Sequence, residues 1–232
     1  MKVWGRVNSI NVMKVLWCAD ECGVAYEREN VGMAFGGNDQ KWYLDMNPNG
    51  VVPTIDDGGR VIWESNSAVR YLAAKYAAGT LWPNDPGQRS EADRWMDWQL
   101  STISEAMRVI FWGLVRTPAE KRDMAAIKKA AVDAGKLWGR LDQKLEGRQY
   151  VAGSHLTMGD IPAGCFVHRW YALDVERPAL KNVAALRRRD LRAQQVAGQS
   201  WLRYRELGLS WAFDFEEPDC DPDGELVRPD GG

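Results

Sequence analysis

The sequence predicts a mixed α/β half followed by an all-helical half. Short strand-like segments alternate with helical patterns over about the first 80 residues. Beyond them the strand patterns stop, and apolar residues recur at helical spacing. Between the halves, residues 77–87 contain two glycines and two prolines, which is typical of a linker. These three observations predict two packed domains of different class.

A strand–helix–strand unit opens the chain. Residues 2–6 predict a short strand, and residues 11–22 carry apolar side chains at helical spacing. Gly23 is suited to end that helix, and residues 25–31 predict a second strand.

A hairpin and a helix follow. Residues 51–56 and 60–63 predict two short strands joined by the turn signal at 57–59, and residues 65–76 predict a helix. The resulting order, βαβ followed by ββα, predicts a mixed four-stranded sheet with helices on both faces. This is the thioredoxin-like arrangement.

Helical patterns fill the second half, over residues 88–116, 119–145, 157–173 and 178–199. The last residues are acidic and rich in Pro, Gly and Asp, so they have little to bury and we expect them to be partly disordered or to lie on the surface. The predicted organisation is a thioredoxin-like domain over 1–78, a linker over 79–87, an all-helical domain over 88–210 and an acidic tail over 211–232.

Composition argues against several classes of protein. The formal net charge is −2, and no basic stripe indicates nucleic acid. No apolar signal segment follows Met1, and the longest strongly apolar run, 109–115, is far too short to span a membrane. We expect a cytoplasmic protein without nucleic-acid or membrane partners.

The cysteines do not indicate a metal site. Cys18 and Cys22 lie four residues apart on one helix face, but no histidine or further cysteine nearby in sequence completes a ligand set. We expect these two, with Cys165 and Cys220, to be small buried residues rather than disulfides, and we expect no metal.

Three segments resemble those of cytosolic glutathione S-transferases. Residues 47–55, Asn-Pro-Asn-Gly-Val-Val-Pro-Thr-Ile, resemble the family's NP-x-G-x-VP segment. Residues 63–72, Trp-Glu-Ser-Asn-Ser-Ala-Val-Arg-Tyr-Leu, resemble its ES-x-A-x-x-x-YL segment. Residues 157–163 resemble the capping box of its helical domain, and the pair Thr157 and Asp160 is assigned to folding. The resemblance covers roughly residues 1 to 205.

The resemblance implies a glutathione site. The family's proline at Pro53 has a cis bond, which leaves the backbone of Val52 able to pair with the cysteinyl backbone of glutathione. Ser65, as the cap of a helix N-terminus, would hold the γ-glutamyl carboxylate, and Glu64 the γ-glutamyl ammonium. An edge-strand proline and a simply capped helix are the alternatives without a ligand.

The nucleophile would be the thiol of glutathione. A free thiol has a pKa of about 8.5, so hydrogen-bond donors and a helix N-terminus must favour the thiolate. Residues 6–14 contain neither Cys nor Tyr, and their Ser9-x-Asn11-x-x-Lys14 spacing resembles the bacterial theta-like and nu-like branches. We predict Ser9 as the donor to the thiolate and Asn11 as the second group, although Asn11 could also cap the helix.

Val51 departs from the family pattern, because many relatives carry Lys, Arg or Gln there near the glycyl carboxylate. Gln40 or Lys41 would then serve that end of glutathione, or no side chain would. An electrophile pocket is expected between the domains. Its predicted lining is Met107, Arg108, Phe111 and Trp112, with Trp170 and Trp211 as weaker candidates and core packing as the alternative.

The leading function is conjugation of glutathione to an electrophilic small molecule by an activated thiolate. One alternative uses the same thiolate to reduce a disulfide or a hydroperoxide. Another is a non-enzymatic binding or structural module on the same fold. The resemblance also implies a homodimer whose ligands are glutathione and a hydrophobic electrophile.

Overall fold

A four-stranded mixed sheet forms the first half, as the sequence predicts. The computed structural model describes residues 1–196, with side chains through residue 189. The strands are β1 (Lys2–Trp4), β2 (Glu27–Glu29), β3 (Thr54–Asp56) and β4 (Val61–Trp63), in the order β2-β1-β3-β4. The β1–β2 pair is parallel and the other two pairs are antiparallel.

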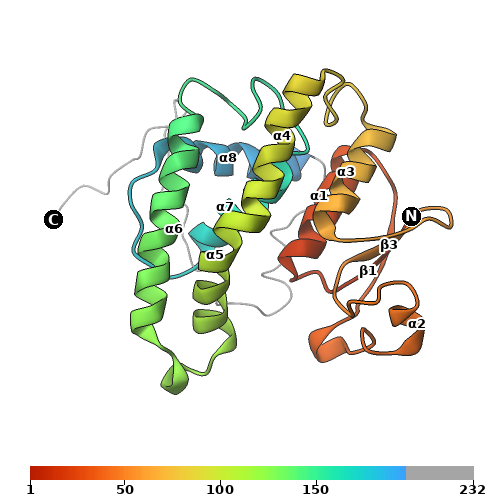
Figure 1. Ribbon diagram of the computed structural model, residues 1–232, viewed down its shortest axis with the longest axis horizontal. Coiled ribbons are helices and arrows are strands. Elements are labelled where there is room, and N and C mark those ends of the chain that lie inside the picture. The colour runs from red at the N-terminus through yellow and green to blue at the C-terminus, as the bar shows by residue number, and fades with distance from the viewer. Residues whose placement is uncertain (197–232) are drawn as a thin grey trace. The chain divides into compact units, whose positions relative to one another are not determined.

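Helices cover this sheet. The helices α1 (Ile10–Glu21) and α3 (Ser65–Tyr76) pack against each other, and the short α2 (Lys41–Leu44) lies on the far side of the strands from them (Figure 1). A 3₁₀ turn, η1 (Met33–Phe35), precedes α2. The strands are shorter than predicted, although the chain after β1 stays hydrogen-bonded to the β2 side through the Gly5 and Arg6 N–H groups.

The second half is helical. Its first predicted helix begins at Pro86, because the Asp85 side chain caps it by accepting the Gln88 N–H at 2.8 Å. It is not one regular helix: α4 (Pro86–Trp98) passes through a π-helical turn, η2 (Gln99–Ile103), into α5 (Ser104–Phe111) and a second π-helical turn, η3 (Trp112–Arg116). The remaining elements are η4 (Ala119–Lys121), α6 (Met124–Lys144), α7 (Asp160–Ala172) and α8 (Lys181–Val196).

A row of tryptophans forms much of this core. The rings of Trp98 and Trp138 lie 5.8 Å apart, and those of Trp138 and Trp170 lie 6.4 Å apart. Trp138 and Trp170 are fully buried, so Trp170, a weaker candidate for the electrophile pocket, packs in the core instead. Trp211, Cys220 and the predicted tail over 211–232 lie outside the described residues.

The start of α7 approaches α4 closely. A Cβ on Gly159 would lie 2.6 Å from the carbonyl oxygen of Ala92, so only glycine fits there. The predicted capping box lies beside it. The Asp160 carboxylate accepts the backbone N–H and the hydroxyl of Thr157, at 2.9 and 3.0 Å, and the N–H of Val151 at 2.8 Å. These bonds anchor the loop before α7 to its first turn.

No helix within residues 1–196 is both long enough and apolar enough to cross a membrane.

Candidate functional site

Ser9 lies at the N-cap of α1. Its backbone is extended, with φ −85° and ψ 122°, and its side chain makes no capping hydrogen bond. The first intrahelical bond runs from the Met13 N–H to the Ser9 carbonyl at 2.9 Å. The N–H groups of residues 10–12 therefore have no acceptor within the helix. The hydroxyl is therefore placed beside the positive end of the helix dipole without serving as its cap.

Asn11 is an exposed residue in the first turn of α1 and is not its cap, because Ser9 occupies that position. A turn joins this helix start to the end of β1, with the Ser9 N–H donating to the Arg6 carbonyl at 3.1 Å. In the same turn the side-chain oxygen of Asn8 and the Nε of Arg6 are buried and have no hydrogen-bond partner among the described residues.

The loop before β3 holds the Val52–Pro53 bond, which is cis. Three side chains fix this loop. The hydroxyl of Tyr43 and the amide of Asn47 donate to the Val51 carbonyl at 2.7 and 2.8 Å, and Thr54 bonds to both. In the described part of the chain, neither the N–H nor the C=O of Val52 has a hydrogen-bond partner. That backbone is available to an extended ligand.

Glycine brings this loop against the start of α1. A Cβ on Gly5 would lie 2.5 Å from a side-chain carbon of Val12 and 3.2 Å from the Cβ of Val52, so both residues lie against Gly5. The backbone of Val52 and the helix start that carries Ser9 are therefore neighbours.

Glu64 and Ser65 open α3. Glu64 is exposed and occupies the cap position with φ +67° and ψ 110°, an unfavourable conformation for a residue with a side chain. Ser65, which the sequence predicts as the cap, is instead the first helical residue and is 6% exposed. Strained residues of this kind cluster where ligands are held.

The two polar side chains predicted for the glycyl end of glutathione, Gln40 and Lys41, both bond to nearby acidic residues. Gln40 is exposed at the start of α2, where its amide bonds to Asp39 at 3.2 Å, and Lys41 pairs with Asp45 at 2.8 Å. The Val51 side chain is 52% exposed.

The four predicted electrophile-pocket residues lie on α5 and η3 in different environments. Met107 is buried. Arg108 is exposed and forms an ion pair with Glu105 at 2.7 Å. Phe111 lies beneath the guanidinium of Arg169, 4.1 Å from the ring centroid, and Trp112 is 51% exposed.

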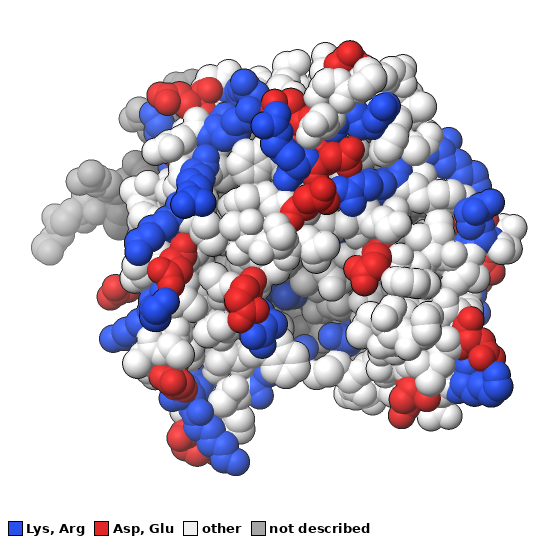
Figure 2. Space-filling model, viewed as in Figure 1, with Lys and Arg blue, Asp and Glu red and all other residues white. Residues whose placement is uncertain are grey.

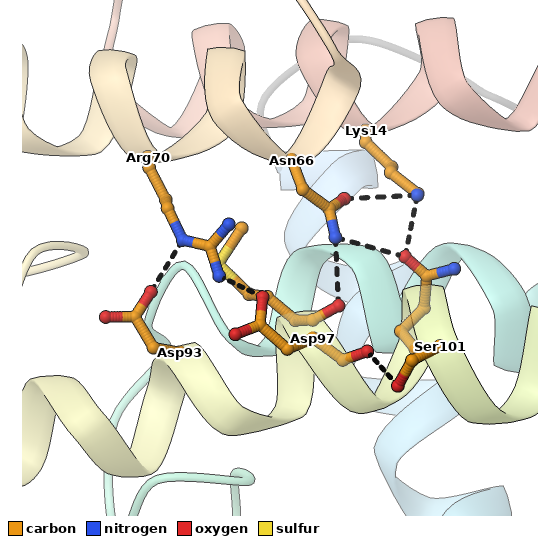
Figure 3. Close-up of polar contacts among 8 residues, drawn as sticks. Lys14, Asn66, Arg70, Asp93, Asp97 and Ser101 are labelled. Carbon is orange, nitrogen blue, oxygen red and sulfur yellow. Dashed lines mark hydrogen bonds and ion pairs between the residues drawn. The ribbon is translucent and has the colours of Figure 1, made fainter.

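A buried polar cluster lies beneath the first turn of α3 (Figure 3). The ammonium of Lys14, on α1, is fully buried and donates to the side-chain oxygens of Asn66 at 3.1 Å and Gln99 at 2.7 Å. The Asn66 amide in turn donates to the Met96 carbonyl at 2.9 Å. Lys14 also lies over the ring of Phe166, 5.2 Å from its centroid. The cluster joins α1, α3, α7 and the π-helical turn η2.

Burial lowers the pKa of Lys14 to about 8. Cys165 and Glu64 act in the opposite direction, and Arg169 adds to the lowering. Beside this cluster, Arg70 of α3 forms ion pairs with Asp93 and Asp97 of α4 at 2.6 and 2.5 Å (Figure 3).

Sequence reasoning singled out Lys14 only through its spacing and missed Asn66, Gln99 and Arg6. Asn66 follows Ser65 directly, which was the available signal. Nothing near Gln99 in the sequence marks it as a partner of Lys14, because the two are 85 residues apart.

The described residues show no metal or disulfide chemistry. No group of three or more His, Cys, Asp or Glu within them is arranged to hold a metal ion. Cys18 and Cys165 are buried, Cys22 is half-buried, and all three are free thiols.

Comparison with known proteins agrees with this geometry. The family described as "Glutathione S-transferase, N-terminal domain" matches residues 8–75. Glutathione S-transferase GstB of Escherichia coli is 40% identical over 202 residues, which is 79% of this chain and 97% of GstB.

Solved structures lead to the same family. The theta class glutathione S-transferase of Xanthomonas axonopodis pv. citri, with glutathione bound, superposes with a TM-score of 0.81 at 49% identity, covering 84% of this chain and 94% of its own. The Bombyx mori glutathione transferase BmGSTD1, at 24% identity and a TM-score of 0.75, shares the fold and covers 91% of this chain and 94% of its own. The chain therefore belongs to the glutathione S-transferase family.

Proposed function

We propose that this protein activates the thiol of glutathione and transfers it to an electrophilic small molecule, with Ser9 as the donor to the thiolate. The observation that carries this proposal is the hydroxyl of Ser9, which lies at the N-terminus of α1 without capping it. The first turn of that helix and Val52 both lie close to Gly5. Lowering a thiol pKa by two corresponds to about 2.7 kcal/mol. A hydrogen bond to the charged sulfur and a helix N-terminus can each contribute about 1 kcal/mol or more.

The glutathione-binding roles follow the family pattern. In this proposal the backbone of Val52, next to Pro53, pairs with the cysteinyl part as an added strand. Ser65 and the first turn of α3 take the γ-glutamyl carboxylate, and Glu64 takes the ammonium. Gln40 faces the glycyl end. The glutathione bound in the Xanthomonas structure supports these assignments, because that protein is similar over 84% of this chain.

The second substrate would lie against α5 and η3. Phe111 and Trp112 would provide apolar surface, Arg108 a polar edge, and the buried Met107 would support them from below. Asn11 would assist Ser9 from the exposed first turn of α1. We further propose a cytoplasmic homodimer, whose stoichiometry light scattering would test.

Calorimetry with glutathione tests the binding site. Ser65→Ala should weaken binding about tenfold, because a buried hydroxyl contact to a carboxylate is lost. Ser67→Ala is the matched control, since Ser67 lies in the same helical turn but is exposed. No binding to the wild type at millimolar glutathione would refute the proposal.

Turnover tests the reaction. A chlorodinitrobenzene should be conjugated, and Ser9→Ala should lower kcat more than it raises the KM for glutathione. Turnover of a glutathione mixed disulfide or a hydroperoxide, without turnover of the aryl halide, would favour the reductase alternative. Binding without either reaction would favour the non-enzymatic one.

A further inference from the structure

Two arginines near the predicted electrophile pocket have no acidic partner among residues 1–189. Arg6 begins the turn that joins β1 to α1, and its guanidinium lies beside Gly32, where an added Cβ would be 3.1 Å from Nη1. Its Nε is buried without a partner among the described residues. Arg116 ends η3, and its guanidinium lies 5.6 Å from the Phe111 ring centroid. Neither arginine forms an ion pair within residues 1–189.

The positive charge of Arg116 acts on Arg6. Burial, and then the positive charge of Arg116, lower the pKa of the Arg6 guanidinium, and no carboxylate of the described residues opposes them. Arg169 of α7 places a third guanidinium over the Phe111 ring, 4.1 Å from its centroid. Like charges held together beside a buried donor are unfavourable unless an anion sits between them. Planar guanidinium groups bind carboxylates and similar acids through paired hydrogen bonds.

The pair is close to the proposed chemistry. The backbone carbonyl of Arg6 accepts the N–H of Ser9 at 3.1 Å, so the two residues share one turn. Arg116 follows Trp112 and contacts Phe111, which are both predicted to line the pocket. Figure 2 shows basic side chains inside the hollow near the centre of the face it draws. Arg6 therefore lies in the turn that carries Ser9, and Arg116 lies beside a residue predicted to contact the electrophile.

We propose that the electrophile is an anion: Arg6 and Arg116 bind an acidic group on the small molecule while Phe111 packs against its apolar part. This inference rests on the proposed transferase function and adds the substrate class. The glycyl carboxylate of glutathione is the competing occupant. The electrophile is favoured because Arg116 belongs to the helical half and stacks on a predicted pocket residue.

Two matched substrates test the proposal: a neutral chlorodinitrobenzene, and the chlorodinitrobenzoate that has the same reacting carbon and an added carboxylate. In both, the glutathione sulfur forms a bond to the aryl carbon and the C–Cl bond breaks. Chloride leaves with the electron pair, and the thiol proton goes to solvent. The measured quantity is the ratio of kcat/KM for the benzoate to kcat/KM for the neutral substrate, each corrected for the uncatalysed rate.

Arg6→Gln and Arg116→Gln should each lower this ratio about tenfold or more, because a charged hydrogen bond to the substrate is lost. Arg140→Gln, which removes an exposed arginine of α6, should leave the ratio unchanged. The ratio is insensitive to partial misfolding, which lowers both rates together. An unchanged ratio in both variants would overturn the proposal. If the KM for glutathione rises while the ratio stays unchanged, the two arginines bind the glycyl carboxylate of glutathione instead, which also overturns it.

Binding of the unreactive dinitrobenzoate, followed by calorimetry, separates this inference from the proposed function. If the wild type binds dinitrobenzoate and Arg116→Gln weakens that binding about tenfold, the anion site is supported even if no conjugation occurs. If the neutral substrate is conjugated but dinitrobenzoate does not bind at millimolar concentration, the anion site is overturned and the transferase function stands.

Discussion

The buried ammonium of Lys14 makes the stability of the protein depend on alkaline pH. Burial lowers its pKa from 10.5 to about 8 in the folded chain. The unfolded chain therefore binds this proton more strongly, and the free energy of unfolding rises with pH between about 8 and 10.5. The change corresponds to about 3 kcal/mol in total, of which about 2 to 3 kcal/mol should appear between pH 7 and pH 10.

Lys14→Met isolates this effect. At about pH 7 the variant no longer buries a charge, but it leaves the side-chain oxygen of Asn66 without its donor, which costs about 1–3 kcal/mol. These effects should offset each other to within about 2 kcal/mol. At about pH 10 the burial penalty is largely gone from the wild type, so only the lost hydrogen bonds remain and the variant should be the less stable protein.

The assay is urea unfolding followed by tryptophan fluorescence, at one protein concentration and several pH values. The difference in unfolding free energy between wild type and Lys14→Met should grow by about 2 to 3 kcal/mol from pH 7 to pH 10. Lys128→Met, which removes an exposed lysine of α6, controls for other alkaline groups and should show no such trend. A difference that stays constant within about 0.5 kcal/mol would show that the Lys14 ammonium is not destabilised by burial.

Three further changes probe the packing that holds the site. Gly159→Ala should lower the free energy of unfolding by about 2 kcal/mol or more, because its Cβ would lie 2.6 Å from the Ala92 carbonyl oxygen. The control is Gly139→Ala, whose added Cβ would have no atom within 4 Å; it should be neutral or stabilising by up to about 1 kcal/mol. If both glycine substitutions changed the free energy of unfolding in urea equally, the close approach of Gly159 to α4 would not matter. Asp160→Ala should cost about 3 kcal/mol, since two buried N–H groups lose their acceptor, and thermal unfolding unchanged by the substitution would show that these bonds are unimportant. Arg70→Met should cost about 1 kcal/mol at low salt and less at about 1 M salt, because its ion pairs are partly exposed; a cost independent of salt would point to packing instead.

The sequence was sufficient for the architecture, because strand and helix periodicities, glycine turns and the linker are local signals. The sequence did not predict where a long helical segment changes from α-helix to π-helix. The predicted helix over 88–116 contains two π-helical turns. At the first, the Ser104 hydroxyl donates to the Gln99 carbonyl at 2.7 Å, a bond that apolar spacing does not reveal.

The environment of the site was less predictable than its position. A lysine on a helix is expected at the surface, and Lys14 is buried only because amide oxygens from residues 52 and 85 positions away meet it. Arg6, which follows β1, and Arg116, at the end of η3, likewise come from the two different halves of the chain. Contacts of this range depend on tertiary structure and leave no local pattern in the sequence.

Titrating the thiol of enzyme-bound glutathione through its ultraviolet absorbance shows whether Ser9 stabilises the glutathione thiolate. The wild-type complex should titrate about two below the free-thiol pKa of about 8.5, and Ser9→Ala should raise that pKa by about one, as loss of one charged hydrogen bond requires. Ser9→Thr, which keeps a hydroxyl, should restore most of the shift. A bound thiol that titrates at its free value in the wild type, or at the same pKa in Ser9→Ala, would show that Ser9 does not stabilise the thiolate.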